Sequence, residues 1–128
     1  HVHRLLKPNG KCLIRIPLVD SLVWEKYGTN WVELDAPRHL YLHSRRSISI
    51  LAMEANLKLF SIMPDSTRFE FLGSEQYKRG IPLKAENSFL IKPEKSIFTS
   101  KELVEFEELA AQANHESKSG RACMFLEK

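Results

Sequence analysis

The first seventeen residues allow few local structures, and their core is the stretch Leu5-Leu6-Lys7-Pro8-Asn9-Gly10-Lys11-Cys12-Leu13-Ile14-Arg15-Ile16-Pro17. The apolar residues at the start have helical spacing, at Val2, Leu5 and Leu6. Pro8 cannot continue a helix, and Asn9-Gly10 tolerates the positive φ angles of a tight turn. Residues 11–17 are mostly apolar, as in a strand that is covered on both faces of a sheet, and proline ends that strand because it cannot donate to a ladder. The opening therefore predicts the end of a helix, a turn and a buried strand.

Composition excludes several classes of protein. At 128 residues the chain is one domain or part of one. No apolar run approaches the roughly 20 residues that span a bilayer, and the start has no secretory pattern. A formal net charge of +3 gives no strong nucleic-acid signal. Cys12 and Cys123 lie in apolar runs and are expected to be buried free thiols, so we expect a cytoplasmic protein without a membrane partner.

Helical and strand patterns alternate along the rest of the chain. Helices are predicted at 21–27, 45–55, 69–78 and 99–115, and strands at 57–63 and 121–128. Ser44 is a typical N-cap, and Thr99 with Glu102 forms a capping-box pattern. No structure is predicted for residues 84–98. Strands that alternate with helices indicate an α/β sheet, here of three strands.

The connection over residues 18–43 is too long for an ordinary link, and such loops are usually functional or partly structured. It leaves the carboxyl end of the first strand, which is the side where ligands bind in open α/β sheets. Its aromatic residues either line a substrate pocket or pack the loop onto the sheet. These residues are Trp24, Tyr27, Trp31 and Tyr41.

Two stretches carry a family resemblance. Arg4 to Ile14 resembles the "R-x-L-K-P-G-G" turn and the fifth strand of class I S-adenosylmethionine-dependent methyltransferases, with Asn9 where the family usually has glycine. Residues 31–44 read Trp-Val-Glu-Leu-Asp-Ala-Pro-Arg-His-Leu-Tyr-Leu-His-Ser. That stretch is similar to the "W-x-x-L-D-x-P-R-H-L-x-x-F-S" segment of a subgroup that includes many enzymes of the type 12 and type 23 kind, and it is the more specific of the two.

The resemblance implies a fold. It makes residues 1–128 a single partial domain, the C-terminal half of a Rossmann-like methyltransferase fold, with residues 18–43 as a loop insertion. The expected sheet is three-stranded and mixed, in the family order 5-7-6, with the last strand antiparallel and helices on its flanks. Residues 11–17, 122–127 and 57–63 would take those places in that order. Because the chain also begins inside a predicted helix, we interpret it as part of a longer domain.

The resemblance also implies where S-adenosylmethionine would bind. In the family, a glycine-rich turn after the first strand and an acidic residue after the second hold this cofactor. This chain has five glycines and no G-x-G cluster. Most of the cofactor site is therefore expected upstream of His1, with no cofactor-binding residue in this chain.

The polar residues of the long loop are the candidate site. His39 is a candidate general base near neutral pH, and Arg38 could clamp a carboxylate or phosphate. Asp35, Trp31 and Tyr41 are the other candidate substrate-side residues. The alternative is that Pro37-Arg38-His39 only shapes the loop, with Arg38 paired to Asp35 or Glu33. No metal site is expected, because His1, His3 and Cys12 do not have zinc-ligand spacing.

Two functions follow from these observations. The first is the substrate-side portion of a methyltransferase that acts on an unknown methyl acceptor and is inactive as an isolated chain. The second is a non-catalytic interaction module that self-associates through an exposed strand at residues 11–17, because unpaired strand edges recruit partners.

Overall fold

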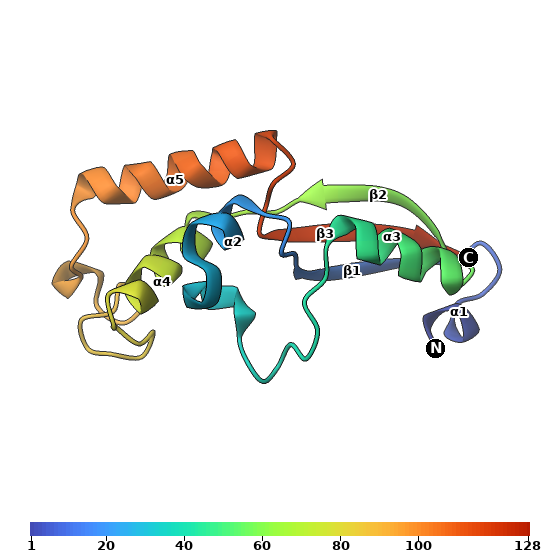
Figure 1. Ribbon diagram of the computed structural model, residues 1–128, viewed down its shortest axis with the longest axis horizontal. Helices are drawn as coiled ribbons and strands as arrows, with labels where there is room; N and C mark the ends of the chain where they lie inside the picture. The colour runs from blue at the N-terminus through green and yellow to red at the C-terminus, as the bar shows by residue number, and fades with distance from the viewer.

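The computed structural model describes residues 1–128 and divides into a sheet region and a helical region (Figure 1). Its three strands are β1 (Lys11–Pro17), β2 (Lys58–Pro64) and β3 (Arg121–Glu127). Its α-helices are α1 (Val2–Leu5), α2 (Leu22–Tyr27), α3 (Arg45–Glu54), α4 (Arg68–Lys78) and α5 (Ser100–His115). The sheet and α3 occupy one end of the molecule, and α2, α4 and α5 occupy the other. No helix combines the length and the apolar composition that are needed to span a bilayer.

The sheet differs in kind from the one expected. Its order is β1-β3-β2, so the three strands take the expected places, but β3 is antiparallel to both neighbours. The sheet is therefore fully antiparallel, and the expectation of a mixed, Rossmann-like sheet is wrong. The reason is that β1 and β2, which run in the same direction, share no hydrogen bonds because β3 lies between them. A mixed sheet would need a pair of adjacent parallel strands.

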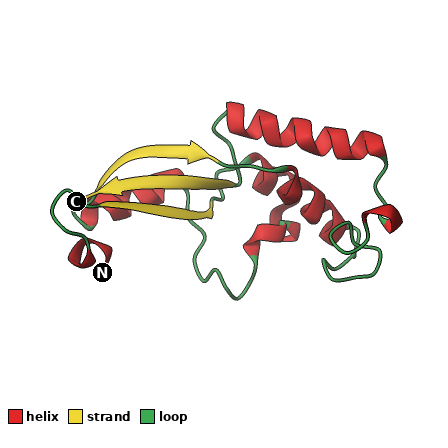
Figure 2. Cartoon of the chain, turned by 180° about the vertical axis from the view of Figure 1, so that it is seen from behind, coloured by secondary structure: helices red, strands yellow, loops and turns green.

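One face of the sheet is open, which corrects the expectation of a strand covered on both faces. Exposure alternates along β1, and the Leu13 side chain on the open face is 54% exposed. Phe60 and Met63 of β2 are also exposed large apolar residues. The two views of the chain agree that α3 covers the opposite face (Figure 2). The period of two therefore reflects a sheet with one covered face.

The hydrophobic residues form two separate clusters. The sheet cluster joins Leu18, Ala52 of α3, Leu57 and the inward side chains of β3. The helical cluster contains Val23, Tyr27, Trp31, Val32, Phe71, Leu72, Phe106, Ala110 and Ala113. The helical cluster holds the large aromatic side chains, so most of the aromatic burial lies outside the sheet region.

Local signals place the helix ends as predicted. The Ser44 hydroxyl accepts a hydrogen bond from the Ser47 N–H at 3.1 Å, and the Ser47 side chain completes a capping box. Thr99 and Glu102 form the second capping box at the start of α5. Each such cap stabilises its helix by about 1 kcal/mol. Gly28, with φ 51°, caps the end of α2.

Residues 84–98, for which no structure was predicted, form turns and a short 3-10 helix (Pro93–Lys95). A buried amide holds this segment to α4, because Gln76 Nε2 donates to Ser88 Oγ at 3.1 Å. The Phe89 N–H donates to Gln76 Oε1 at 3.0 Å. Cys12 and Cys123 are free thiols, and both are half-buried instead of fully buried.

Candidate functional site

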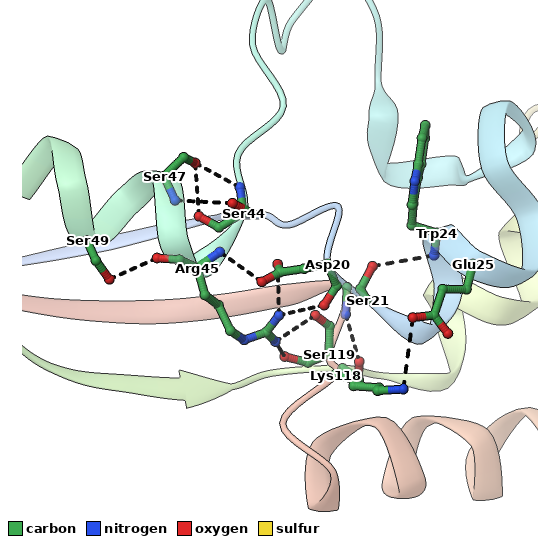
Figure 3. Close-up of polar contacts among 12 residues, drawn as sticks. Asp20, Ser21, Trp24, Glu25, Ser44, Arg45, Ser47, Ser49, Lys118 and Ser119 are labelled. Atoms are coloured by element: carbon green, nitrogen blue, oxygen red, sulfur yellow. Dashed lines mark hydrogen bonds and ion pairs between the residues drawn. The ribbon is translucent and has the colours of Figure 1, made fainter.

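The long loop begins and ends at one place beside the sheet. The Leu18 N–H donates to the Gly120 carbonyl at 2.7 Å, and the Val19 N–H donates to the His43 carbonyl at 2.9 Å. The Arg45 guanidinium fixes the junction, because it donates to the Asp20 carboxylate at 3.0 Å and to the Ser119 carbonyl at 3.1 Å (Figure 3). Both ends of the loop are therefore held at the carboxyl end of β1. Arg45 has a structural role here, and it is not a free cation.

A cleft of about 770 Å³ lies between this loop, the end of β1, α4 and the turn at residues 82–84. Its lining is partly apolar, from Ile16, Pro17, Val32, Phe69, Tyr77, Pro82 and Leu83. The rest of the lining is charged or polar, from Arg15, Glu33, Asp35, Arg38, His39, Lys84 and Arg121. An apolar wall that faces a few convergent polar groups is the usual character of a small-molecule site.

The structure brings together three of the five predicted site residues. Asp35, Arg38 and His39 all line the cleft. Trp31 does not, because its side chain is 1% exposed and lies in the helical cluster. Tyr41 is 78% exposed and does not line the cleft either. The aromatic residues of the loop were expected either to line a substrate pocket or to pack the loop onto the sheet. Trp31 has a packing role, in the helical cluster.

The geometry of Asp35, Arg38 and His39 separates their roles. Arg38 Nη1 lies 3.0 Å from Asp35 Oδ2, as the loop-shaping alternative proposed, but the Arg38 side chain is 78% exposed. Exposed ion pairs contribute only about 0–1 kcal/mol, so this pair adds little to the stability of the loop. The His39 Nδ1 lies 3.3 Å from the Leu34 carbonyl. If the proton is on Nδ1, it is donated to that carbonyl and Nε2 is free to accept a proton.

Sequence reasoning missed the charged floor of the cleft. Arg121 Nη1 lies 2.6 Å from Glu33 Oε1, and Arg121 Nε lies 3.1 Å from Asp65 Oδ2. Arg15 also pairs with Asp65. Burial raises the pKa of Glu33, and the Arg121 charge opposes that rise. Burial also acts to raise the pKa of Asp65, but the hydrogen bonds and charges of Arg15 and Arg121 outweigh it and hold that pKa below its usual range.

Glu70 is a buried carboxyl group next to this network. Glu70 is only 1% exposed, and neither of its carboxyl oxygens has a hydrogen-bond partner. Burial raises its pKa to about 7, and the nearby Ser66 hydroxyl opposes the rise. Gly120 lies so close that a Cβ atom there would collide with the Glu70 carboxylate.

Comparison with known proteins gives no further support for a family. No protein-family model matches the sequence. No curated protein matches it either. The structure contains no group of three or more His, Cys, Asp or Glu side chains that are placed to hold a metal ion.

Proposed function

We propose that this chain supplies the acceptor-binding portion of an S-adenosylmethionine-dependent methyltransferase. The observation that carries the proposal is the position of Asp35, Arg38 and His39. These residues belong to the more specific of the two resembling stretches, and all three line one cleft at the carboxyl end of β1. The unpaired cysteines agree with a cytoplasmic protein.

The residues of the cleft do not fit the whole cofactor. S-adenosylmethionine carries a sulfonium cation and ribose hydroxyls, which call for an available carboxylate. Of the two carboxylates that line the cleft, Glu33 is held by Arg121 and Asp35 is paired with Arg38 on an exposed loop, and no glycine lines the cleft. The proposal therefore assigns cofactor binding to residues outside this chain, and we expect residues 1–128 alone to transfer no methyl group.

Within this proposal the chain binds and orients the acceptor. The apolar wall excludes water from one side of the acceptor, and positioning of this kind supplies much of the rate enhancement of a two-substrate reaction. His39 Nε2, left free when Nδ1 donates to the Leu34 carbonyl, accepts the proton of an acceptor hydroxyl or amine. His39 is needed as a base only where the acceptor must lose a proton.

The test is a methyl-transfer assay with the full-length product of the gene that encodes this chain. S-adenosylmethionine labelled in its methyl group is incubated with the protein and a deproteinised cell extract as the pool of acceptors. We expect label in the extract, and we expect His39→Ala to lower the rate by about 100-fold if the acceptor must be deprotonated. His115→Ala, an exposed histidine at the end of α5, is the matched control and should leave the rate unchanged. A folded protein that labels nothing would overturn the proposal.

Calorimetry separately tests the assignment of cofactor binding to residues outside this chain. We expect S-adenosylhomocysteine to show no binding to residues 1–128. Tight one-to-one binding would show that this chain contains a complete cofactor site, and the assignment of that site to other residues would then be wrong.

A second function is favoured by the open sheet. β1 is an edge strand of the three-stranded sheet, and Leu13, Phe60 and Met63 are exposed on it and on β2. Apolar edge strands are templates for pairing with another chain. On this alternative, the chain is a non-catalytic interaction module.

We expect the isolated chain to self-associate through β1. Sedimentation equilibrium should show a mass that rises with protein concentration. Leu13→Lys should shift the association to higher concentration, because a charge on an edge strand opposes pairing. A strictly monomeric chain at the highest concentration measured would contradict this prediction.

A further inference from the structure

We propose that the cleft selects methyl acceptors that carry an anionic group on an apolar body, and that Arg38 and Lys84 hold the anionic group. This inference rests on the proposed function, because it names the substrate class of the same cleft. It depends on three observations: the charge balance of the lining, the accessibility of two cations, and the apolar wall opposite them.

The first observation is an excess of positive charge. Four cations line the cleft, namely Arg15, Arg38, Lys84 and Arg121. The carboxylates that compensate them are Glu33 on Arg121, Asp35 on Arg38 and Asp65 on Arg15. Lys84 makes no ion pair and no side-chain hydrogen bond. The charged residues of the lining and their ion-pair partners therefore carry an excess of positive charge, which favours an anionic ligand.

The second observation is that the cations differ in how firmly they are held. Arg121 is part of the framework, because its side chain is 19% exposed and it contacts Glu33, the Asp65 carboxylate and the Asp65 carbonyl. Arg38 is 78% exposed and makes one ion pair, and Lys84 is exposed. These two can turn towards a ligand without leaving a buried carboxylate unpaired. Arg38 also presents the planar fork of donors that suits a carboxylate or a phosphate.

The third observation is the wall provided by α4 and the turn after it. Phe69 and Tyr77 come from α4, and Pro82 and Leu83 come from the turn that leads to Lys84. The cation on Lys84 therefore directly follows two apolar lining residues in the sequence. A ligand that uses both features has an anionic group next to an aromatic or aliphatic body, and a cleft of about 770 Å³ has room for a small organic acid of that kind.

The test uses two fluorescent probes that differ by one charged group. 1-Anilinonaphthalene-8-sulfonate is anionic, and N-phenyl-1-naphthylamine has the same aromatic body without the sulfonate. Both are titrated into residues 1–128. We expect the anionic probe to bind about tenfold more tightly, and added salt to weaken only the anionic probe. Arg38→Gln and Lys84→Gln should each raise its Kd by about three- to fivefold, and the double variant by about tenfold or more.

Controls separate the cleft from other surfaces. Lys58→Gln removes an exposed lysine that makes no ion pair, at the opposite end of the sheet, and should leave both Kd values unchanged. Arg38→Gln, Lys84→Gln and the double variant should bind the neutral probe as tightly as the wild-type chain does, because they leave the apolar wall intact. Benzoate or phenyl phosphate should displace the anionic probe, and benzyl alcohol should not. Of the two anions, the one that displaces it at lower concentration identifies the preferred acceptor group.

Equal affinity for the two probes, or an anionic probe that is insensitive to both cleft substitutions, would overturn the inference. The measurement needs neither cofactor nor methyl transfer, so its failure is distinct from failure of the proposed function. Label transfer by the full-length protein together with equal probe affinities would mean that the acceptor is neutral. Charge-dependent binding without label transfer would support an anion-binding cleft with another activity.

Discussion

We expect Trp31→Ala to lower the free energy of unfolding by about 3–5 kcal/mol, the range found for large aromatic side chains that are truncated in a core. Trp31 is 1% exposed, and its ring meets the Trp24 ring edge-on at a centroid distance of 6.4 Å. It packs in the cluster that also holds Val32 and Phe71. Alanine would leave a cavity in this cluster that the surrounding side chains fill only in part. Urea unfolding followed by circular dichroism measures the change.

The same loop provides a matched control. Tyr41→Ala removes another aromatic side chain, but one that is 78% exposed, and its effect should stay within about 0.5 kcal/mol. Trp31→Phe should cost less than Trp31→Ala, because it keeps most of the ring and removes a buried indole N–H that has no hydrogen-bond partner. A loss below about 1 kcal/mol for Trp31→Ala would contradict a core role for this side chain.

The second large effect concerns pH. The pKa of Glu70 is raised from 4.5 to about 7 in the folded chain. The folded chain therefore binds more protons than the unfolded chain between these values, and stability falls as the pH rises through that window. The stability that comes from protonated Glu70 is fully present below pH 4.5 and is lost above about pH 7. The shift corresponds to about 3 kcal/mol.

Glu70→Gln should remove this dependence. The amide has the shape of the protonated carboxyl group and carries no charge. At pH 8 we expect the variant to be more stable than the unchanged chain by up to about 3 kcal/mol, and at pH 4 we expect nearly equal stabilities. Glu108→Gln is the matched control, because this carboxylate is exposed on α5 and makes no ion pair. A pH profile that is the same for the unchanged chain and Glu70→Gln would contradict the prediction.

Features that depend on neighbouring residues were predictable from the sequence. The caps at Ser44 and Thr99 and the turn at Asn9-Gly10 are set by side chains within three or four positions, so their signals lie in one short window. The order of the three strands agrees with the expected one. The sheet type does not, because it depends on which strands share hydrogen bonds.

The cleft was only partly predictable for the same reason. Asp35, Arg38 and His39 stand together in one stretch, and they stay together in the fold. Arg121 and Glu33 form their ion pair across 88 positions, and no local pattern joins them. Trp31 and Tyr41 show the limit within a loop: an irregular segment has no period of 2 or 3.6 that would tell an inward side chain from an outward one.

The two hydrophobic clusters have a consequence for cooperativity. Each is a candidate unit of local unfolding, and amide hydrogen exchange would show two levels of protection if they open separately. The cleft takes Arg15 and Arg121 from the sheet region and Phe69 and Tyr77 from the helical region, so it exists only while both units are closed. A ligand in the cleft would therefore stabilise both units at once. Saturation should merge the two levels of protection and couple the opening of the sheet to that of the helices.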